Sequence, residues 1–175
     1  LQDYVTKFYN IVISGSEDCD KKAFLQAFLY ALPKYHRTAI LEKNNTLKTT
    51  LLDELHQTIS KQHPVLALLE HTQKMHIDRL VIDELEEEDI SPLFQTLNTG
   101  RLGTGLLTTF TANSAAEALE NINAFICQTP EIDELDANHL IEHNINLIIH
   151  LEADTTNPFG VRVVELLEVG ECLLV

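Results

Sequence analysis

Short apolar runs alternate along the chain with stretches whose apolar residues recur at helical spacing. The uninterrupted runs at residues 11–13 and 80–82 are typical of strands buried on both faces of a parallel sheet. We predict strands over residues 10–14, 37–41, 80–82, 106–111, 145–151 and 161–169, with a further edge strand at 171–175. We predict helices over residues 21–32, 47–60, 65–75, 90–97, 115–127 and 134–143. This alternation indicates an α/β domain over residues 1–175, with a mostly parallel sheet covered by helices on both faces.

Two of these helices carry more detailed expectations. Residues 47–60 place Leu47, Leu51, Leu52 and Leu55 on one face of the predicted helix. Ser114, followed three residues later by Glu117, forms a capping-box pattern at the start of the next-to-last helix. A glycine-rich turn at residues 100–105 leads into the strand at 106–111.

Composition and charge exclude several partners. The net charge of −15 argues against nucleic acid and anionic membrane surfaces, because both require a basic footprint. No apolar run approaches the ~18–20 residues of a membrane span, so we expect no direct membrane insertion. The three cysteines are odd in number and far apart, which favours reduced thiols in a cytoplasmic protein without a signal peptide.

The turn after the first strand has the spacing of a phosphate-binding P-loop, G-x-x-x-x-G-K-[ST]. Gly15 and Lys21 match that pattern, and a helical stretch follows. Asp20 stands at the second glycine, and Lys22 stands at the hydroxyl that would bind magnesium. The arrangement is therefore that of a nucleotide site, whereas two of its four defining residues are changed.

Acidic residues in this loop conflict with phosphate binding. The loop carries Glu17, Asp18 and Asp20, whose charges would repel phosphates if they faced the site. The alternative is that Asp20 only caps the helix that starts at Lys21. Asp83, at the end of the strand at 80–82, could hold a magnesium-bound water, or it could simply be solvated.

A short zinc-protease-like pattern occurs near the C-terminus. His139, Glu142 and His143 match H-x-x-E-H, which would place both histidines on one helix face. No third ligand is evident, so we interpret them as surface histidines and expect no metal site.

Five segments in order and spacing together carry a family resemblance. They are NIVISGSEDCDKK from Asn10, LEKNN from Leu41, DRLVIDEL from Asp78, NTGRLGTGLLTTFTANS from Asn98, and NINLIIHLE with GVRVVELLEV near the end of the chain. Together they resemble the motor domain of the type II and type IV secretion and pilus-assembly ATPases, and most closely the branch of type IV secretion and tight-adherence pili. The resemblance implies a three-layer P-loop NTPase domain of the RecA-like kind. It also implies that the upstream domain usual in these proteins is absent from this chain.

The resemblance assigns roles to individual positions. It makes Glu42 and Glu84 the equivalents of the family's catalytic acids, and Gly15, Lys21, Lys22 and Asp83 a degenerate nucleotide site. Further departures from the family pattern follow: Lys43 replaces an aspartate, Glu86 stands where an arginine is usual, and Thr111 replaces a histidine.

Two functions follow from this pattern. The first is a non-catalytic subunit or regulator that associates with active ATPase subunits, as in hexameric rings, or with the secretion or pilus platform. It is expected to need no cofactor and to lie in the cytoplasm, reaching the inner face of the inner membrane through partners. The second is a divergent but working ATPase that uses ATP and magnesium to power secretion or pilus assembly. We favour the first, because Asp20, Lys22 and Thr111 change separate parts of one mechanism.

Overall fold

The chain folds around one mixed sheet with helices on both sides. The computed structural model describes residue 4 and residues 7–60, 64–100, 105–130, 132–157 and 160–169. Within these ranges the strands are β1 (Ile11–Gly15), β2 (Arg37–Glu42), β3 (Asp53–Thr58), β4 (Arg79–Ile82), β5 (Leu106–Thr111), β6 (Leu147–Ala153) and β7 (Val161–Glu168). The helices are α2 (Lys21–Ala31), α3 (Val65–Gln73), α4 (Glu87–Asn98), α5 (Ala115–Cys127) and α6 (Glu134–Asn144).

The strands lie in the order β3-β2-β4-β5-β1-β6-β7. Every neighbouring pair is parallel except β6 and β7, which are antiparallel. Both β1 and β4 have a strand on each side and are fully buried along their length. The prediction that residues 11–13 and 80–82 form inner strands is therefore confirmed.

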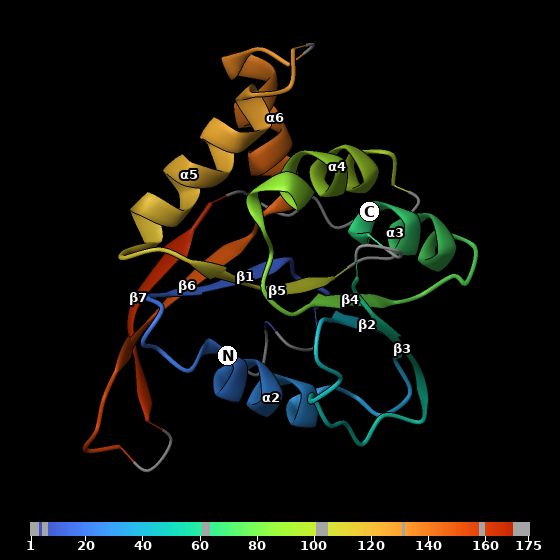
Figure 1. The fold of residues 1–175 in the computed structure, drawn as a ribbon, viewed down its shortest axis with the longest axis vertical. Coiled ribbons are helices and arrows are strands. Elements are labelled where there is room, and N and C mark those ends of the chain that lie inside the picture. Colours follow the sequence, from blue (N-terminus) through green and yellow to red (C-terminus); the bar gives the residue numbers. More distant parts are fainter. Residues whose placement is uncertain are drawn as a thin grey trace.

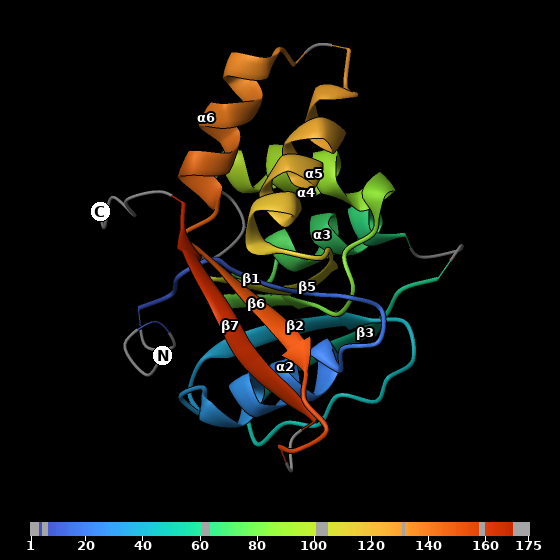
Figure 2. The same cartoon turned by 90° about the vertical axis from the view of Figure 1, so that its left-hand side faces the viewer.

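Helices cover both faces of the sheet, which gives three layers. Figures 1 and 2 show α2 on one side and α3, α4, α5 and α6 on the other. Side chains alternate between the two layers along each strand: Ile11 and Ile13 of β1 pack in the core beneath α2, while Val12 packs in the core of the opposite layer. The predicted three-layer α/β architecture is confirmed.

The predicted helix over residues 47–60 is wrong. Its second half is β3, which pairs in parallel with β2 at the edge of the sheet. The leucines at helical spacing do not share a face: Leu47 and Leu51 pack in the core beneath α2, whereas Leu55 packs in the opposite core and Leu52 is 81% exposed. Tertiary pairing with β2 has therefore overridden the local pattern.

Other boundaries differ by a few residues. Helix α4 begins three residues before the predicted start, and its first turn contains three acidic residues that suit a helix N-terminus. Ser114 caps α5 as predicted, accepting from the backbone N–H of Glu117 at 3.0 Å. The Glu117 carboxylate, however, accepts from the backbone N–H of Asn113 instead of closing the box on Ser114.

The predicted strand at 171–175 and most of the glycine-rich turn at 100–105 lie outside the described residues. No helix in the described ranges has the length and apolarity needed to cross a membrane.

Candidate nucleotide site at the carboxyl ends of the strands

The turn between β1 and α2 is built as a P-loop is, with a helix N-terminus facing the carboxyl edge of the sheet. Helix α2 begins at Lys21, and the Asp20 carboxylate accepts from the backbone N–H of Ala23 at 2.9 Å. This confirms that Asp20 caps the helix. The backbone N–H of Cys19 donates to the Ser16 carbonyl at 3.1 Å, which closes the turn before the cap.

Gly15 is required by close packing at the end of β1. A Cβ atom at this position would lie 3.0 Å from the Leu151 carbonyl oxygen and 3.1 Å from Cys19 Sγ. The first contact is with backbone of the neighbouring strand β6, so it cannot yield by rotating a side chain. The glycine that matches the P-loop pattern thus has a structural role independent of phosphate.

Lys21 folds back onto the loop that precedes it. Its ammonium donates to the carbonyl oxygens of Gly15 at 3.1 Å and Ser16 at 2.9 Å, and the residue is 8% exposed. The predicted phosphate-binding lysine therefore lies at its expected place, where it stabilises the turn.

Lys22 joins two strands through its ammonium group. This group donates to Asp83 Oδ2 at 2.5 Å and to Glu42 Oε2 at 3.1 Å. Because β2 and β4 are neighbours in the parallel sheet, the two carboxylates emerge at the same edge. Burial would lower the pKa of Lys22, but the hydrogen bonds and charges of Asp83 and Glu42 outweigh it, so the pKa is raised.

Glu42 is completely buried and fully hydrogen-bonded. Besides Lys22, its carboxylate accepts from the backbone N–H of Leu47 at 3.0 Å and the hydroxyl of Thr46 at 3.3 Å, and it lies 2.5 Å from His56 Nε2. Burial would raise the pKa of Glu42, yet the hydrogen bonds from Thr46, Lys22, Leu47 and His56 together lower it. The predicted catalytic acid is thus held inside the protein by several donors.

His56 was not identified from the sequence, because it lies in the segment predicted as a helix. As part of β3 it is paired with Ile40 of β2, two residues before Glu42. Recognising a parallel strand here would have placed its side chain on the same side of the sheet as that of Glu42.

Glu84, the second predicted catalytic acid, has an exposed side chain and a left-handed backbone. Its φ is 61°, and its N–H donates to the Thr109 hydroxyl at 2.8 Å. The preceding Asp83 donates its own N–H to the Leu41 carbonyl at 2.9 Å, which fixes the end of β4 against β2.

These groups surround a cleft of about 220 Å³ at the P-loop. Its lining residues are Glu17, Cys19, Asp20, Lys21, Lys22, Asn44, Asp83, Glu84 and Thr109. The structure thus brings together the predicted Lys21, Lys22, Asp83 and Glu84, whereas Asp18 does not line the cleft. Its volume lies below the ~300–1,000 Å³ of typical small-molecule pockets.

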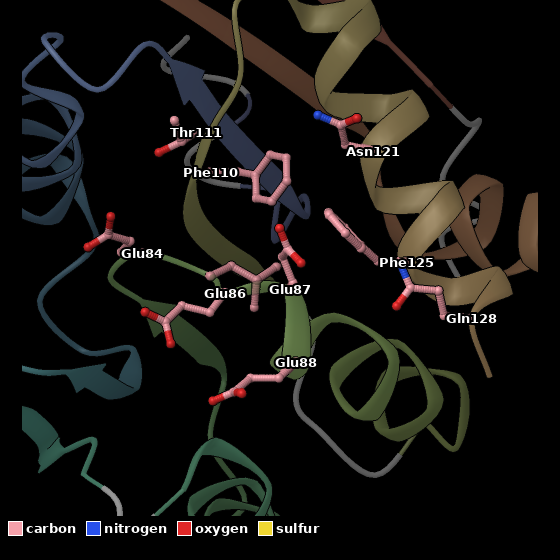
Figure 3. A pocket seen from close by; sticks show the side chains of 10 residues that line it. Glu84, Glu86, Glu87, Glu88, Phe110, Thr111, Asn121, Phe125 and Gln128 are labelled. Carbon is pink, nitrogen blue, oxygen red and sulfur yellow. The ribbon is translucent and has the colours of Figure 1, made fainter.

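A second, larger cleft of about 610 Å³ shares Glu84 with the first (Figure 3). It is lined by residues of the loop before α4, the first turn of α4, the end of β5 and helix α5 with its C-terminal cap: Glu84, Leu85, Glu86, Glu87, Glu88, Phe110, Thr111, Asn121, Phe125 and Gln128. Beside it, burial followed by the charges of Glu88 and Glu86 raises the pKa of Asp89 to about 6, against a smaller opposing effect of Lys43. The Lys43 ammonium forms an ion pair with Glu86.

The histidine pattern near the C-terminus is an exposed pair on α6. The His143 Nδ1 lies 2.8 Å from the His139 carbonyl oxygen, a local helical contact. Among the described residues there is no group of three or more histidines, cysteines or carboxylates that could hold a metal ion. The interpretation as surface histidines is consistent with this arrangement.

Comparison with known proteins identifies relatives of this domain. No family model matches the chain. It is 27% identical over 165 residues to a probable conjugal transfer protein TrbB of Sinorhizobium fredii, covering 91% of this chain and 48% of that protein.

Solved structures show the same fold. The VirB11 ATPase of the Brucella suis type IV secretion system, crystallised with sulphate, matches with a TM-score of 0.83 and 16% identity over 95% of this chain and 52% of that one. The Legionella pneumophila ATPase DotB matches with a TM-score of 0.73 and 16% identity over 97% of this chain and 48% of that one. The chain spans about half the length of these relatives. The chain is therefore similar in sequence to a probable conjugal transfer protein, and it has the fold of the ATPase domain of the VirB11 and DotB ATPases, as the resemblance to the secretion and pilus-assembly ATPases implies.

Proposed function

We propose that this domain is a non-catalytic member of the secretion ATPase group, acting as a subunit or regulator. One observation carries the proposal: two loop carboxylates, those of Glu17 and Asp20, line the cleft where phosphates would lie, in addition to Asp83 and Glu84, which a working site would also contain. The two lysines that line the same cleft, Lys21 and Lys22, already donate to protein oxygens.

The charges at the cleft argue against tight nucleotide binding. A carboxylate ~4 Å from a phosphate charge costs about 1 kcal/mol in water and about 4 kcal/mol near a protein surface of effective dielectric 20. Micromolar affinity supplies only about 8 kcal/mol in total. Two such contacts, from Glu17 and Asp20, would therefore cancel most of the free energy of binding.

The retained fold supports a role in association. The relatives include an ATPase of a type IV secretion system and a probable conjugal transfer protein. We propose that the domain associates in the cytoplasm with homologous ATPase subunits or with platform proteins of such a system. Light scattering of an equimolar mixture with a purified active subunit is expected to show a joint complex. If the mixture is passed over a size-exclusion column before the light-scattering detector, two separate species at micromolar concentration would contradict the association.

A working ATPase is the second candidate. Lys21 stands at the first residue of α2, as a P-loop lysine does, and Glu42 and Asp83 end adjacent strands at the same edge. This reading requires the loop acids to turn towards solvent and Lys22 to leave its two carboxylates.

Calorimetry with magnesium-ATP distinguishes the two. We expect the natural domain to bind more weakly than ~1 mM, which corresponds to about 4 kcal/mol. The triple substitution Glu17→Gly, Asp20→Gly and Lys22→Thr removes two lining carboxylates and restores the hydroxyl. It should tighten binding at least about tenfold, a difference of about 1.4 kcal/mol. Turnover should remain undetectable, because Lys43 and Thr111 are unchanged.

The matched control is Asp18→Gly, because this exposed carboxylate lies in the same loop but does not line the cleft. It should leave binding unchanged. Micromolar affinity of the natural domain would support the working ATPase. A triple variant that binds no better than the natural domain would show that the turn is not a changed P-loop.

A further inference from the structure

The ammonium of Lys22 lies at the meeting point of two carboxylates from different strands. It contacts Asp83 Oδ2 at 2.5 Å and Glu42 Oε2 at 3.1 Å. Lys22 is the residue at which the P-loop pattern has a serine or threonine whose hydroxyl binds Mg²⁺. A protein cation is thus present where the pattern would use a metal-binding group.

The two carboxylates around this ammonium are matched to it and leave no place for a metal ion. The Glu42 side chain is 0% exposed and that of Asp83 13% exposed, so neither charge is well hydrated, and a cation between them stabilises both. The Lys22 side chain is 33% exposed and connects the pair to solvent. A divalent ion would have to compete with the Lys22 ammonium for the same carboxylate oxygens of Glu42 and Asp83. The residues present therefore do not fit a bound Mg²⁺.

We propose that the ammonium of Lys22 substitutes for the divalent cation of this site. It makes Glu42 and Asp83 into a metal-independent clamp that holds the first turn of α2 against the ends of β2 and β4. This rests on the proposed function in treating the site as non-catalytic. Its test uses metal without nucleotide, so the two can fail separately.

If the ammonium occupies the place of a divalent cation, replacing Lys22 should allow such a cation to bind between Glu42 and Asp83. In Lys22→Thr the ammonium is removed, a hydroxyl is supplied, and the two carboxylates face a path to solvent. Two carboxylates, a hydroxyl and several waters are a ligand set that hard divalent cations accept.

In the experiment, Mn²⁺ alone is titrated into the natural domain, Lys22→Thr and Lys43→Thr. Binding is measured by calorimetry and by the Mn²⁺ paramagnetic resonance signal. We expect Lys22→Thr to bind one Mn²⁺ with a dissociation constant on the order of 10⁻⁴–10⁻³ M. The natural domain should bind at least about tenfold more weakly. Lys43→Thr is the matched control, because it also removes a lysine paired with a carboxylate, here Glu86 at the larger cleft, but leaves the clamp intact. It should behave as the natural domain does.

A second substitution and a second measurement keep the test decisive. Adding Asp83→Asn to Lys22→Thr should abolish the gained binding, and Mn²⁺ should raise the melting temperature of Lys22→Thr but not that of Lys43→Thr. If Lys22→Thr does not fold, Lys22→Ser, which also supplies a hydroxyl, takes its place in both measurements. The proposal is overturned if the substituted protein gains no Mn²⁺ binding, or if the natural domain or Lys43→Thr binds Mn²⁺ equally well.

Discussion

Lys22→Met is expected to lower the free energy of unfolding by about 2–3 kcal/mol at pH 7. Removing one partner of a buried ion pair costs ~3–5 kcal/mol, because it leaves an unpaired buried charge. We reduce that range because the Lys22 side chain is one-third exposed, so that water partly screens the pair, and because Glu42 keeps its contacts with Leu47, Thr46 and His56. Methionine retains the apolar stem, and the loss therefore reports on the ammonium. Urea denaturation followed by circular dichroism measures it.

Two further variants isolate the electrostatic cause. Lys22→Met combined with Glu42→Gln should recover part of the loss, because the buried carboxylate is no longer charged. Lys43→Met, which breaks the exposed pair with Glu86, should change stability by less than about 1 kcal/mol. An equal loss in Lys22→Met and Lys43→Met would show that the clamp contributes no more than a surface pair.

The loss should also depend on pH. The folded-state pKa of Glu42 lies below its ordinary value of 4.5, so the stability it contributes is present above that value. This stability disappears as the pH falls through the folded-state pKa. The difference between the natural domain and Lys22→Met should therefore be greatest near neutral pH and shrink once the pH falls below 4.5.

Gly15→Ala is expected to destabilise the domain by about 2–3 kcal/mol, the upper part of the range for overpacking a tight site. The added Cβ would lie 3.0 Å from the backbone oxygen of Leu151, and β1 cannot shift because β5 and β6 hold it on both sides. Thermal and urea unfolding measure the change. No nucleotide is needed for the effect.

A compensating substitution tests this steric origin. Gly15→Ala together with Cys19→Ala removes the contact with the sulfur and should recover part of the stability, whereas the contacts with the Leu151 carbonyl oxygen and with the Cβ of residue 19 remain. Stability equal to that of the natural domain in Gly15→Ala would mean that the turn is looser than its packing indicates.

The buried strands could be predicted because burial on both faces leaves an uninterrupted apolar run, as at residues 11–13. Strand β3 could not be predicted in this way. It lies at an edge of the sheet, so its sequence DELHQT is mostly polar, and the leucines around it repeat by coincidence at helical spacing. Only the pairing with β2 identifies it as a strand.

The site was predictable where the chemistry is local. Asp20 as a cap and Lys21 at the start of the helix follow from neighbouring residues alone. The clamp was not predictable, because Lys22 lies 20 residues from Glu42 and 61 residues from Asp83 in sequence. The pattern showed that a hydroxyl was missing at Lys22; the folded chain shows which side chains its ammonium contacts.

The ion pair between Lys43 and Glu86 joins two positions at which this sequence differs from the family pattern. By resemblance, the first position usually holds an aspartate and the second an arginine. Both signs are reversed here, and the reversed residues contact each other. The two positions that the resemblance marks as departures are thus electrostatically coupled. Lys43→Asp alone would place two carboxylates together and Glu86→Arg alone two cations, whereas the double substitution would keep an opposite-charge pair.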